Sequence, residues 1–187
     1  MDDCCNRITK VLQLQSMYTC IVDTPLGPMR TAAAGNALRG LWFMGQKYFP
    51  SAPETWLDAP DYPVFVSLKA WLEDYFAGKR PKARLPLSPA GTDFQRSVWK
   101  LLREIPYGKT STYGAIAARL ASGRGSGGRI AAQAVGGAVG HNPISLIIPC
   151  HRVLGADGSL TGYAGGLEKK RALLELEGVM LMYAGNQ

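Results

Sequence analysis

A proline-rich and basic segment in the middle of the chain constrains the fold more than any other feature. Residues 79–91 contain three prolines, four lysines or arginines, and no helical period. Because proline lacks a backbone donor and breaks helices, the segment is predicted to be a linker. Its basic side chains are expected to be solvated, and contact with phosphates is the alternative. The 187-residue chain is therefore expected to form two domains, residues 1–88 and residues 89–187.

The first of these parts has the pattern of an antiparallel sheet followed by one helix. Residues 17–23, 29–34 and 37–43 have the composition of strands, and proline and glycine mark the turn after the first of them. From residue 63 to residue 77 apolar side chains recur at helical spacing, and Gly78 follows as a stop signal. A small meander with a helix over one face is expected.

The second part has mainly helical patterns. Residues 92–95, Thr-Asp-Phe-Gln, match a capping box and open an apolar stripe that ends near residue 106. Thr112 is expected to cap a short helix, and a glycine-rich turn then leads to a second helix at about residues 129–139. The apolar run 144–148 is predicted to be a strand. These patterns favour an α+β fold, with a small N-terminal α/β domain and a mostly helical C-terminal domain containing a helix-turn-helix.

Composition limits the class of protein. The net charge of +7 and the isoelectric point near 9.4 favour an anionic partner without identifying it. Apolar runs are far shorter than the roughly 18 residues of a membrane span, and the N-terminus has no targeting pattern, so a soluble intracellular protein is expected. No metal is expected either, and reduced thiols are predicted because the cysteines lack the spacing of a disulfide framework or a zinc site: Cys4, Cys5, Cys20 and Cys150.

Cys150 and His151 are the residues most suggestive of chemistry. A thiol is a strong nucleophile only as thiolate, and His151 is the adjacent candidate base. In an extended segment neighbouring side chains point to opposite faces, so a bridging water and a carboxylate behind His151 are expected. Such a relay predicts a lowered pKa for Cys150. The alternative is a buried structural cysteine beside a surface histidine.

Four motifs around this pair resemble the O6-alkylguanine-DNA alkyltransferase family: Asn142-Pro143, residues 149–153 (Pro-Cys-His-Arg-Val), residues 162–166 (Gly-Tyr-Ala-Gly-Gly) and Glu177-Gly178. The resemblance covers about residues 92–178 and is looser before them. It implies direct-reversal DNA repair, in which O6-alkylguanine is flipped out of duplex DNA and its alkyl group passes irreversibly to Cys150 in a single turnover. It also implies a ribonuclease-H-like N-terminal domain, and it leaves O4-alkylthymine open as a second substrate.

The resemblance implies a role for each matching catalytic residue. Cys150 is the acceptor, and Glu177 supports His151 in activating it. Asn142 joins the second helix of the helix-turn-helix to the site, and Tyr113 donates a hydrogen bond to the target base. Without the resemblance, an exposed glutamate, an Asn-Pro helix stop and a half-buried tyrosine are the ordinary interpretations.

The resemblance also implies a base pocket and a DNA-contacting helix. Gln133 occupies the position of an arginine that the family inserts into the base stack, and it lacks the guanidinium's charge and plane, so a weaker wedge is expected. Tight helix packing is the alternative explanation for the small residues near it. The pocket is expected to be formed by Tyr163, Val153, Val139 and Ala164, and the DNA contacts by Gln133, Ala134 and Gly136, with Arg129 or Arg124 as compensating cations.

The implied partner is double-stranded DNA carrying O6-alkylguanine, with no cofactor and no membrane. A monomer is expected, and cooperative binding along DNA stays open. The expected location is the cytoplasm, in association with the nucleoid if the protein is bacterial, or the nucleus if it is eukaryotic. Two other functions fit parts of the pattern. A cysteine hydrolase would use Cys150, His151 and a carboxylate, and a lesion sensor or regulator would bind damaged DNA without repair, although sensor relatives replace the cysteine that is intact here.

Overall fold

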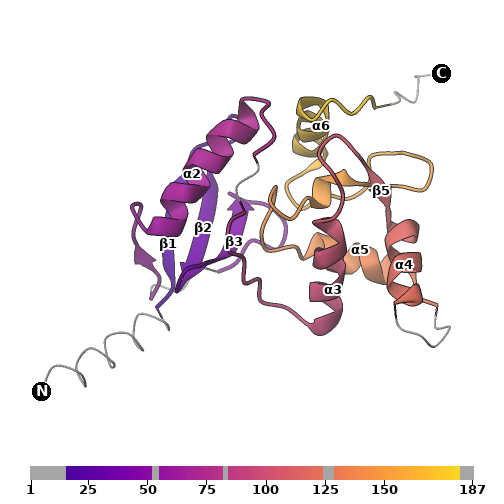
Figure 1. Ribbon diagram of the computed structural model, residues 1–187, viewed down its shortest axis with the longest axis horizontal. Helices are drawn as coiled ribbons and strands as arrows, with labels where there is room; N and C mark the ends of the chain where they lie inside the picture. Colours follow the sequence, from indigo (N-terminus) through magenta and orange to yellow (C-terminus); the bar gives the residue numbers. More distant parts are fainter. Residues whose placement is uncertain (1–15, 52–54, 82–83, 124–128, 182–187) are drawn as a thin grey trace, which may run out of the picture. The chain divides into compact units, whose positions relative to one another are not determined.

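The structure is a computed structural model that describes residues 16–51, 55–81, 84–123 and 129–181 (Figure 1). Its described residues fall into two compact units. The first unit takes the chain up to Met44 and from Phe49 to Ala90, and the second takes residues 45–48 and the chain from Gly91 onward. Within the described ranges, no helix is long and apolar enough to cross a membrane. Cys4, Cys5 and Arg124 lie outside the described residues.

The first unit is built on a four-stranded sheet. Its strands are β1 (Tyr18–Val22), β2 (Met29–Ala34), β3 (Ala37–Phe43) and β4 (Leu57–Asp58). Their order is β3-β2-β1-β4, with β2 antiparallel to both β3 and β1, and β4 parallel to β1. The turn after β1 is closed by the Thr24 hydroxyl, which donates to the Gly27 carbonyl at 2.6 Å. Gly27 has a φ of +104°, a conformation that favours glycine. The three predicted strands are confirmed.

Helix α2 (Pro63–Phe76) supplies the rest of this core. Proline at the first helical turn has no backbone N–H to leave unsatisfied, and Gly78, at a φ of +73°, follows the helix end. The helix buries one stripe of side chains, as the spacing predicts: Val64, Phe65, Leu68, Leu72 and Tyr75. The strands contribute fully buried residues to the same unit, including Met29, Leu38 and Leu41. This burial is the main source of stability in the unit.

The second unit is mostly helical, as predicted. Its elements are α3 (Asp93–Leu102), β5 (Ser111–Thr112), α4 (Tyr113–Ser122), α5 (Ala132–Gly140), the 3-10 helix η1 (Cys150–Arg152), β6 (Val153–Leu154) and α6 (Leu167–Leu176). The capping box is confirmed, because the Gln95 N–H donates to the Thr92 hydroxyl and the Thr92 N–H donates to the Gln95 side chain. Thr112 caps α4 by accepting the Ala115 N–H at 3.1 Å. The α+β fold class predicted from the sequence is confirmed.

Three local predictions in the second unit are wrong. Helix α5 begins at Ala132 rather than near residue 129, and its first residues have no side-chain cap. Residues 144–148 form turns instead of a strand, with Leu146 at a φ of +68°. The run is apolar because it is buried, with Ile144 and Ile148 at 0% and 1% exposure, and burial alone does not set a backbone period. Cys150 lies in a 3-10 turn rather than an extended segment.

Candidate active site

Cys150 is buried beneath the end of α5 and is held by Asn142. The residue is only 4% exposed. The Asn142 amide group donates to the Cys150 Sγ at 3.0 Å and to the Ile148 carbonyl at 2.7 Å, and its Oδ1 accepts the Ile144 N–H at 3.0 Å. Pro143 directs the backbone away from helical geometry at this point. A single side chain therefore adds to the backbone hydrogen bonds of the turn 144–148 and fixes the sulfur against it.

A buried carboxylate lies behind His151. Glu177 is the residue that ends α6, and its Oε1 is 2.9 Å from the His151 Nε2. Arg152 donates to both Glu177 oxygens at 2.8 Å, and the Gly108 N–H donates to Oε2 at 3.1 Å. Arg152 also donates to the Ile105 carbonyl at 2.7 Å. The bidentate guanidinium and the imidazole together compensate the charge of a carboxylate that is only 4% exposed.

Burial and pairing set the charges of this network in opposite ways. Burial opposes ionisation of Glu177, but hydrogen bonds from His151 and Arg152 and their charges hold its pKa well below the usual range. Burial lowers the pKa of His151, and Glu177 offsets this only in part. The imidazole is therefore neutral near pH 7, and the carboxylate at Nε2 favours the proton on that nitrogen. His151 then keeps Nδ1 as its basic nitrogen.

The sequence-based prediction of a lowered pKa for Cys150 is wrong for this resting structure. Burial raises the pKa of the thiol, while the hydrogen bond from Asn142, the charge of Lys170 and the backbone amides of Cys150 and His151 act in the opposite direction. The sequence indicates which polar groups are near the sulfur, but it does not show how deeply the sulfur is buried. Cys150 is therefore held as a thiol and needs a base to become a nucleophile.

Lys170 is a buried cation that the sequence did not single out. Its ammonium, on α6, donates to the Val153 carbonyl at 2.6 Å and to the Thr161 carbonyl at 2.5 Å, and its residue is 0% exposed. Burial lowers its pKa to about 8. One local signal was available, because Lys170 lies three and four residues before the buried Leu173 and Leu174. The side chain ties the strand after Cys150 to the segment that carries Tyr163.

The charges at Glu177 predict a loss of stability in acid. A carboxyl group whose pKa is lower in the folded state stabilises the fold above its unfolded pKa, about 4.3, and this contribution disappears as the pH falls towards the folded value. His151 adds to the trend below about pH 6.5, because its lowered pKa lets the unfolded chain bind more protons. Urea unfolding of the parent and of Glu177→Gln should show their difference in unfolding free energy shrinking below about pH 4.3. A difference independent of pH would contradict this assignment.

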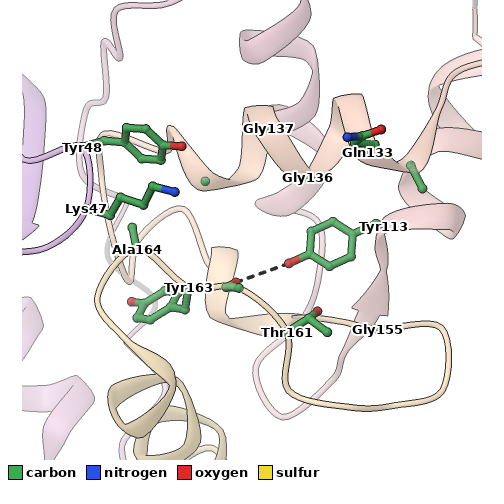
Figure 2. A pocket seen from close by; sticks show the side chains of 13 residues that line it. Lys47, Tyr48, Tyr113, Gln133, Gly136, Gly137, Gly155, Thr161, Tyr163 and Ala164 are labelled. Atoms are coloured by element: carbon green, nitrogen blue, oxygen red, sulfur yellow. Dashed lines mark hydrogen bonds between the residues drawn. The ribbon is translucent and has the colours of Figure 1, made fainter.

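A pocket of about 830 Å³ opens beside α5 in the second unit (Figure 2). Small residues of α5 form one wall, and the Tyr113 ring is close enough to Gly136 that an added Cβ would lie 3.7 Å from it. The Tyr113 hydroxyl donates to the Gly162 carbonyl at 3.4 Å. The lining consists of Lys47, Tyr48, Tyr113, Ala132, Gln133, Gly136, Gly137, Gly140, Gly155, Thr161, Gly162, Tyr163 and Ala164.

The structure brings the predicted residues together to different degrees. Tyr113, Gln133, Gly136, Tyr163 and Ala164 line the pocket. Asn142 contacts the thiol, and His151, the residue after Cys150, pairs with Glu177. None of these four residues is among the described lining residues of the pocket. Val139 and Val153 are buried and are not among the lining residues, and Ala134 and Arg129 are exposed outside the pocket. The prediction for Arg124 lies outside the described residues.

Four charged or aromatic residues at the site were not assigned to it from the sequence: Lys47, Tyr48, Arg152 and Lys170. Arg152 lies inside the quoted motif, but a charged residue next to a histidine gives no sign that it is buried. Lys47 and Tyr48 come from the first half of the chain, and no local pattern connects them to the pocket. They line the pocket because residues 45–48 pack with the second unit in the folded chain.

Comparison with known proteins agrees with this arrangement. The model of the 6-O-methylguanine DNA methyltransferase, ribonuclease-like domain, matches residues 17–89, and the model of the DNA binding domain of the same name matches residues 93–179. The methylated-DNA–protein-cysteine methyltransferase of Mycobacterium tuberculosis is 49% identical over 156 residues, 83% of this chain and 89% of the relative. That of Methanosarcina acetivorans is 44% identical over 162 residues, 87% and 99% of the two chains.

A solved structure has the same fold. The crystal structure of Mycobacterium tuberculosis OGT in complex with DNA matches with a TM-score of 0.78 and 46% identity, over 86% of this chain and 93% of that one. Fold and site thus define a two-part protein, with a ribonuclease-like domain before a helical domain that holds a buried cysteine. The chain belongs to the 6-O-methylguanine DNA methyltransferase family.

Proposed function

We propose that this protein repairs DNA by direct reversal, moving the alkyl group of O6-alkylguanine in double-stranded DNA to Cys150. The observation that carries the proposal is the buried thiol held by Asn142, next in sequence to a buried His151–Glu177 pair and in the same unit as a pocket lined by Tyr113 and Tyr163. The relatives named above are methylated-DNA–protein-cysteine methyltransferases, and the similar solved structure is a complex with DNA. Membership of this family supports DNA repair by alkyl transfer to a cysteine.

The buried position of Cys150 requires the target base to leave the duplex. A stacked and paired base keeps the alkyl carbon out of reach of a sulfur that lies inside the protein, so the nucleotide has to flip into the pocket. Tyr163 and the backbone at Ala164 are proposed to hold the base, with Val139 and Val153 behind them. Tyr113 is proposed to donate a hydrogen bond to the base from the opposite side of the pocket.

The proposed reaction is an in-line displacement at the alkyl carbon. His151 takes the thiol proton, directly or through a water molecule, and the Glu177 carboxylate stabilises the resulting imidazolium. The sulfur then forms a bond to the alkyl carbon as the bond from that carbon to O6 breaks. The electron pair of the broken bond stays on the guanine, where the Tyr113 hydroxyl stabilises the developing charge. The guanine then takes up one proton, which balances the proton that the thiol gave to His151. Guanine stays in the DNA, and Cys150 becomes a thioether.

Helix α5 is proposed to be the surface that meets DNA. Its small residues, including Ala134 and Gly136, let a backbone approach the minor groove closely, and Gln133 is exposed at one end of the pocket, where it is proposed to act as a weak wedge. Arg129 is an exposed cation at the start of this region. With a net charge of +7, phosphate contacts should dominate affinity and make it fall steeply with salt.

The rest of the assignment follows from this activity. We propose that residues 1–88 support the alkyl-accepting domain of residues 89–187, and that the protein acts as a monomer. The reaction draws on no cofactor in this proposal. The compartment is the one that holds DNA, the cytoplasm of a bacterium or the nucleus of a eukaryote. O4-alkylthymine has the same kind of alkyl–oxygen bond and is the second substrate to test.

The thioether predicts one reaction per protein molecule. An S-alkyl cysteine has no electrophilic carbonyl for water to attack, so the product is not hydrolysed. Mixing the protein with excess duplex carrying O6-methylguanine should add one methyl group to each molecule, located on Cys150 by peptide mass spectrometry. Repair of several lesions by one molecule would exclude this mechanism and favour a hydrolase. Tight binding with no gain in mass would favour a lesion sensor.

A further inference from the structure

The loop of residues 45–48 belongs to the wall of the pocket, although it lies between strands of the first unit in the sequence. The Lys47 N–H donates to the Ala164 carbonyl at 2.9 Å. The Tyr48 ring stacks on His141, at the end of α5, with centroids 3.8 Å apart and ring planes at 28°. Tyr48 has a φ of +59°, a costly conformation for an aromatic residue that persists only where surrounding contacts hold it. These two attachments fix the Lys47 backbone relative to the pocket.

Lys47 gives this wall its charge. Among the thirteen described residues that line the pocket, Lys47 alone is ionic and none is acidic. Its ammonium lies 5.0 Å from the centre of the Tyr48 ring, and Figure 2 shows the side chain extending into the pocket above Ala164. A cation over an aromatic face remains available to an anion that approaches from the open side. Among its described lining residues the pocket therefore carries one positive charge, on a loop whose backbone is held in place.

The position of Lys47 in the pocket indicates what it would meet. Gln133 and Tyr113 lie at one end, and Lys47, Tyr48 and Ala164 lie at the other (Figure 2). Because the Ala164 backbone is proposed to hold the base, the group attached to O6 is expected at the end of the pocket where Lys47 lies. The volume of about 830 Å³ falls within the range of pockets that bury ligands of drug size, roughly 300–1,000 Å³, which leaves room for adducts larger than methyl.

We propose that Lys47 is a specificity-determining residue, which favours O6-alkyl groups ending in an anion, such as a carboxylate, over neutral groups of the same shape. The inference rests on the proposed alkyl transfer. The covalent step is unchanged: sulfur bonds to the carbon attached to O6, the bond from that carbon to O6 breaks, and the carboxylate remains on the transferred group. Lys47 forms no covalent bond and acts through a charge-assisted hydrogen bond.

A matched pair of substrates tests this. Duplexes carrying O6-carboxymethylguanine or O6-carbamoylmethylguanine differ in charge and hardly in size. The rate constant for alkylation of Cys150 by each is followed by intact mass, and their ratio is compared between proteins because the two groups differ in intrinsic reactivity. Lys47→Met, which keeps the length and loses the charge, should lower the carboxylate-to-amide ratio by about threefold to tenfold. Lys47→Arg should keep a higher ratio than Lys47→Met.

Controls separate this inference from the proposed function. Lys109→Met removes one exposed lysine of the second unit outside the pocket lining and should leave the ratio at the parent value. If Lys47→Met slows both substrates by the same factor, Lys47 contacts a DNA phosphate and the proposal is overturned. Equal ratios in the Met and Arg variants would also overturn it. Transfer from O6-methylguanine by the parent is the separate check, because its failure removes the proposed function itself.

Discussion

Replacing Cys150 with alanine should abolish alkyl transfer from O6-methylguanine while the protein still folds and binds DNA. The thiol is the proposed acceptor, and no other group at the site has comparable nucleophilicity. Removing one buried sulfur costs about 1 kcal/mol of stability, a small fraction of the free energy of a folded domain. Intact mass after incubation with the damaged duplex should remain that of the unmodified variant, and a gel-shift assay should still show a complex.

Cys20 offers a matched control for this result. It is the other free cysteine of the described residues, in β1 of the first unit, where burial raises the pKa of its thiol and its Sγ lies 3.3 Å from the Thr31 hydroxyl. Cys20→Ala should gain one methyl group at the parent rate. Methylation of Cys150→Ala at that rate would show that another residue accepts the alkyl group and would end the assignment.

Replacing Glu177 with alanine should lower the free energy of unfolding more than replacing Cys150 does. The change leaves the Arg152 guanidinium and the His151 imidazole buried without the carboxylate that three of their donor atoms contact at 2.8–2.9 Å. Breaking a buried ion pair on one side costs about 3–5 kcal/mol. Urea unfolding at neutral pH should show a loss of this size. Transfer to Cys150 should slow by up to about 10²–10⁴, the usual contribution of a general base, because His151 loses the carboxylate that positions it.

Two variants show which part of this effect belongs to the buried charge. Glu175→Ala removes an exposed carboxylate from the same helix and should change stability by no more than about 0.5 kcal/mol. Glu177→Gln keeps the shape and one acceptor oxygen, so it should unfold at a urea concentration between those of Glu177→Ala and the parent. If Glu177→Ala were as stable as Glu175→Ala, the network would carry little of the fold's free energy.

Local patterns were sufficient to predict much of the fold. The sequence predicted strands β1, β2 and β3 and helix α2 because hydrophobic periodicity and turn residues indicate the same bounds for each element. It predicted the Thr92 cap because a capping box involves only residues close in the sequence. Strand β4 was missed, since its two residues are exposed and have no alternation to detect. The turn 144–148 was misassigned because the Asn142 side chain supplies part of its hydrogen bonding, which apolar periodicity does not represent.

The site residues that belong to motifs with a defined spacing could be predicted from the sequence. Cys150, His151, Asn142 and Glu177 were identified through motifs, and the structure places them in one buried cluster. Burial itself was not predictable from neighbouring residues. It depends on α6 folding back over η1, and it reverses the expected direction of the Cys150 pKa and hides Arg152 from an analysis based on local sequence.

The excursion of residues 45–48 into the second unit bears on how this protein can be dissected. A fragment beginning at residue 89, the proposed domain boundary, would keep the acceptor thiol but lose Lys47 and Tyr48, so the His141 ring and the Ala164 carbonyl would lack the partners they have here. The shortened polypeptide would recognise lesions through an altered recess. A single cut at residue 89 therefore does not leave the pocket complete in either fragment. The selectivity of the C-terminal fragment for alkylated bases would then differ from that of the intact protein.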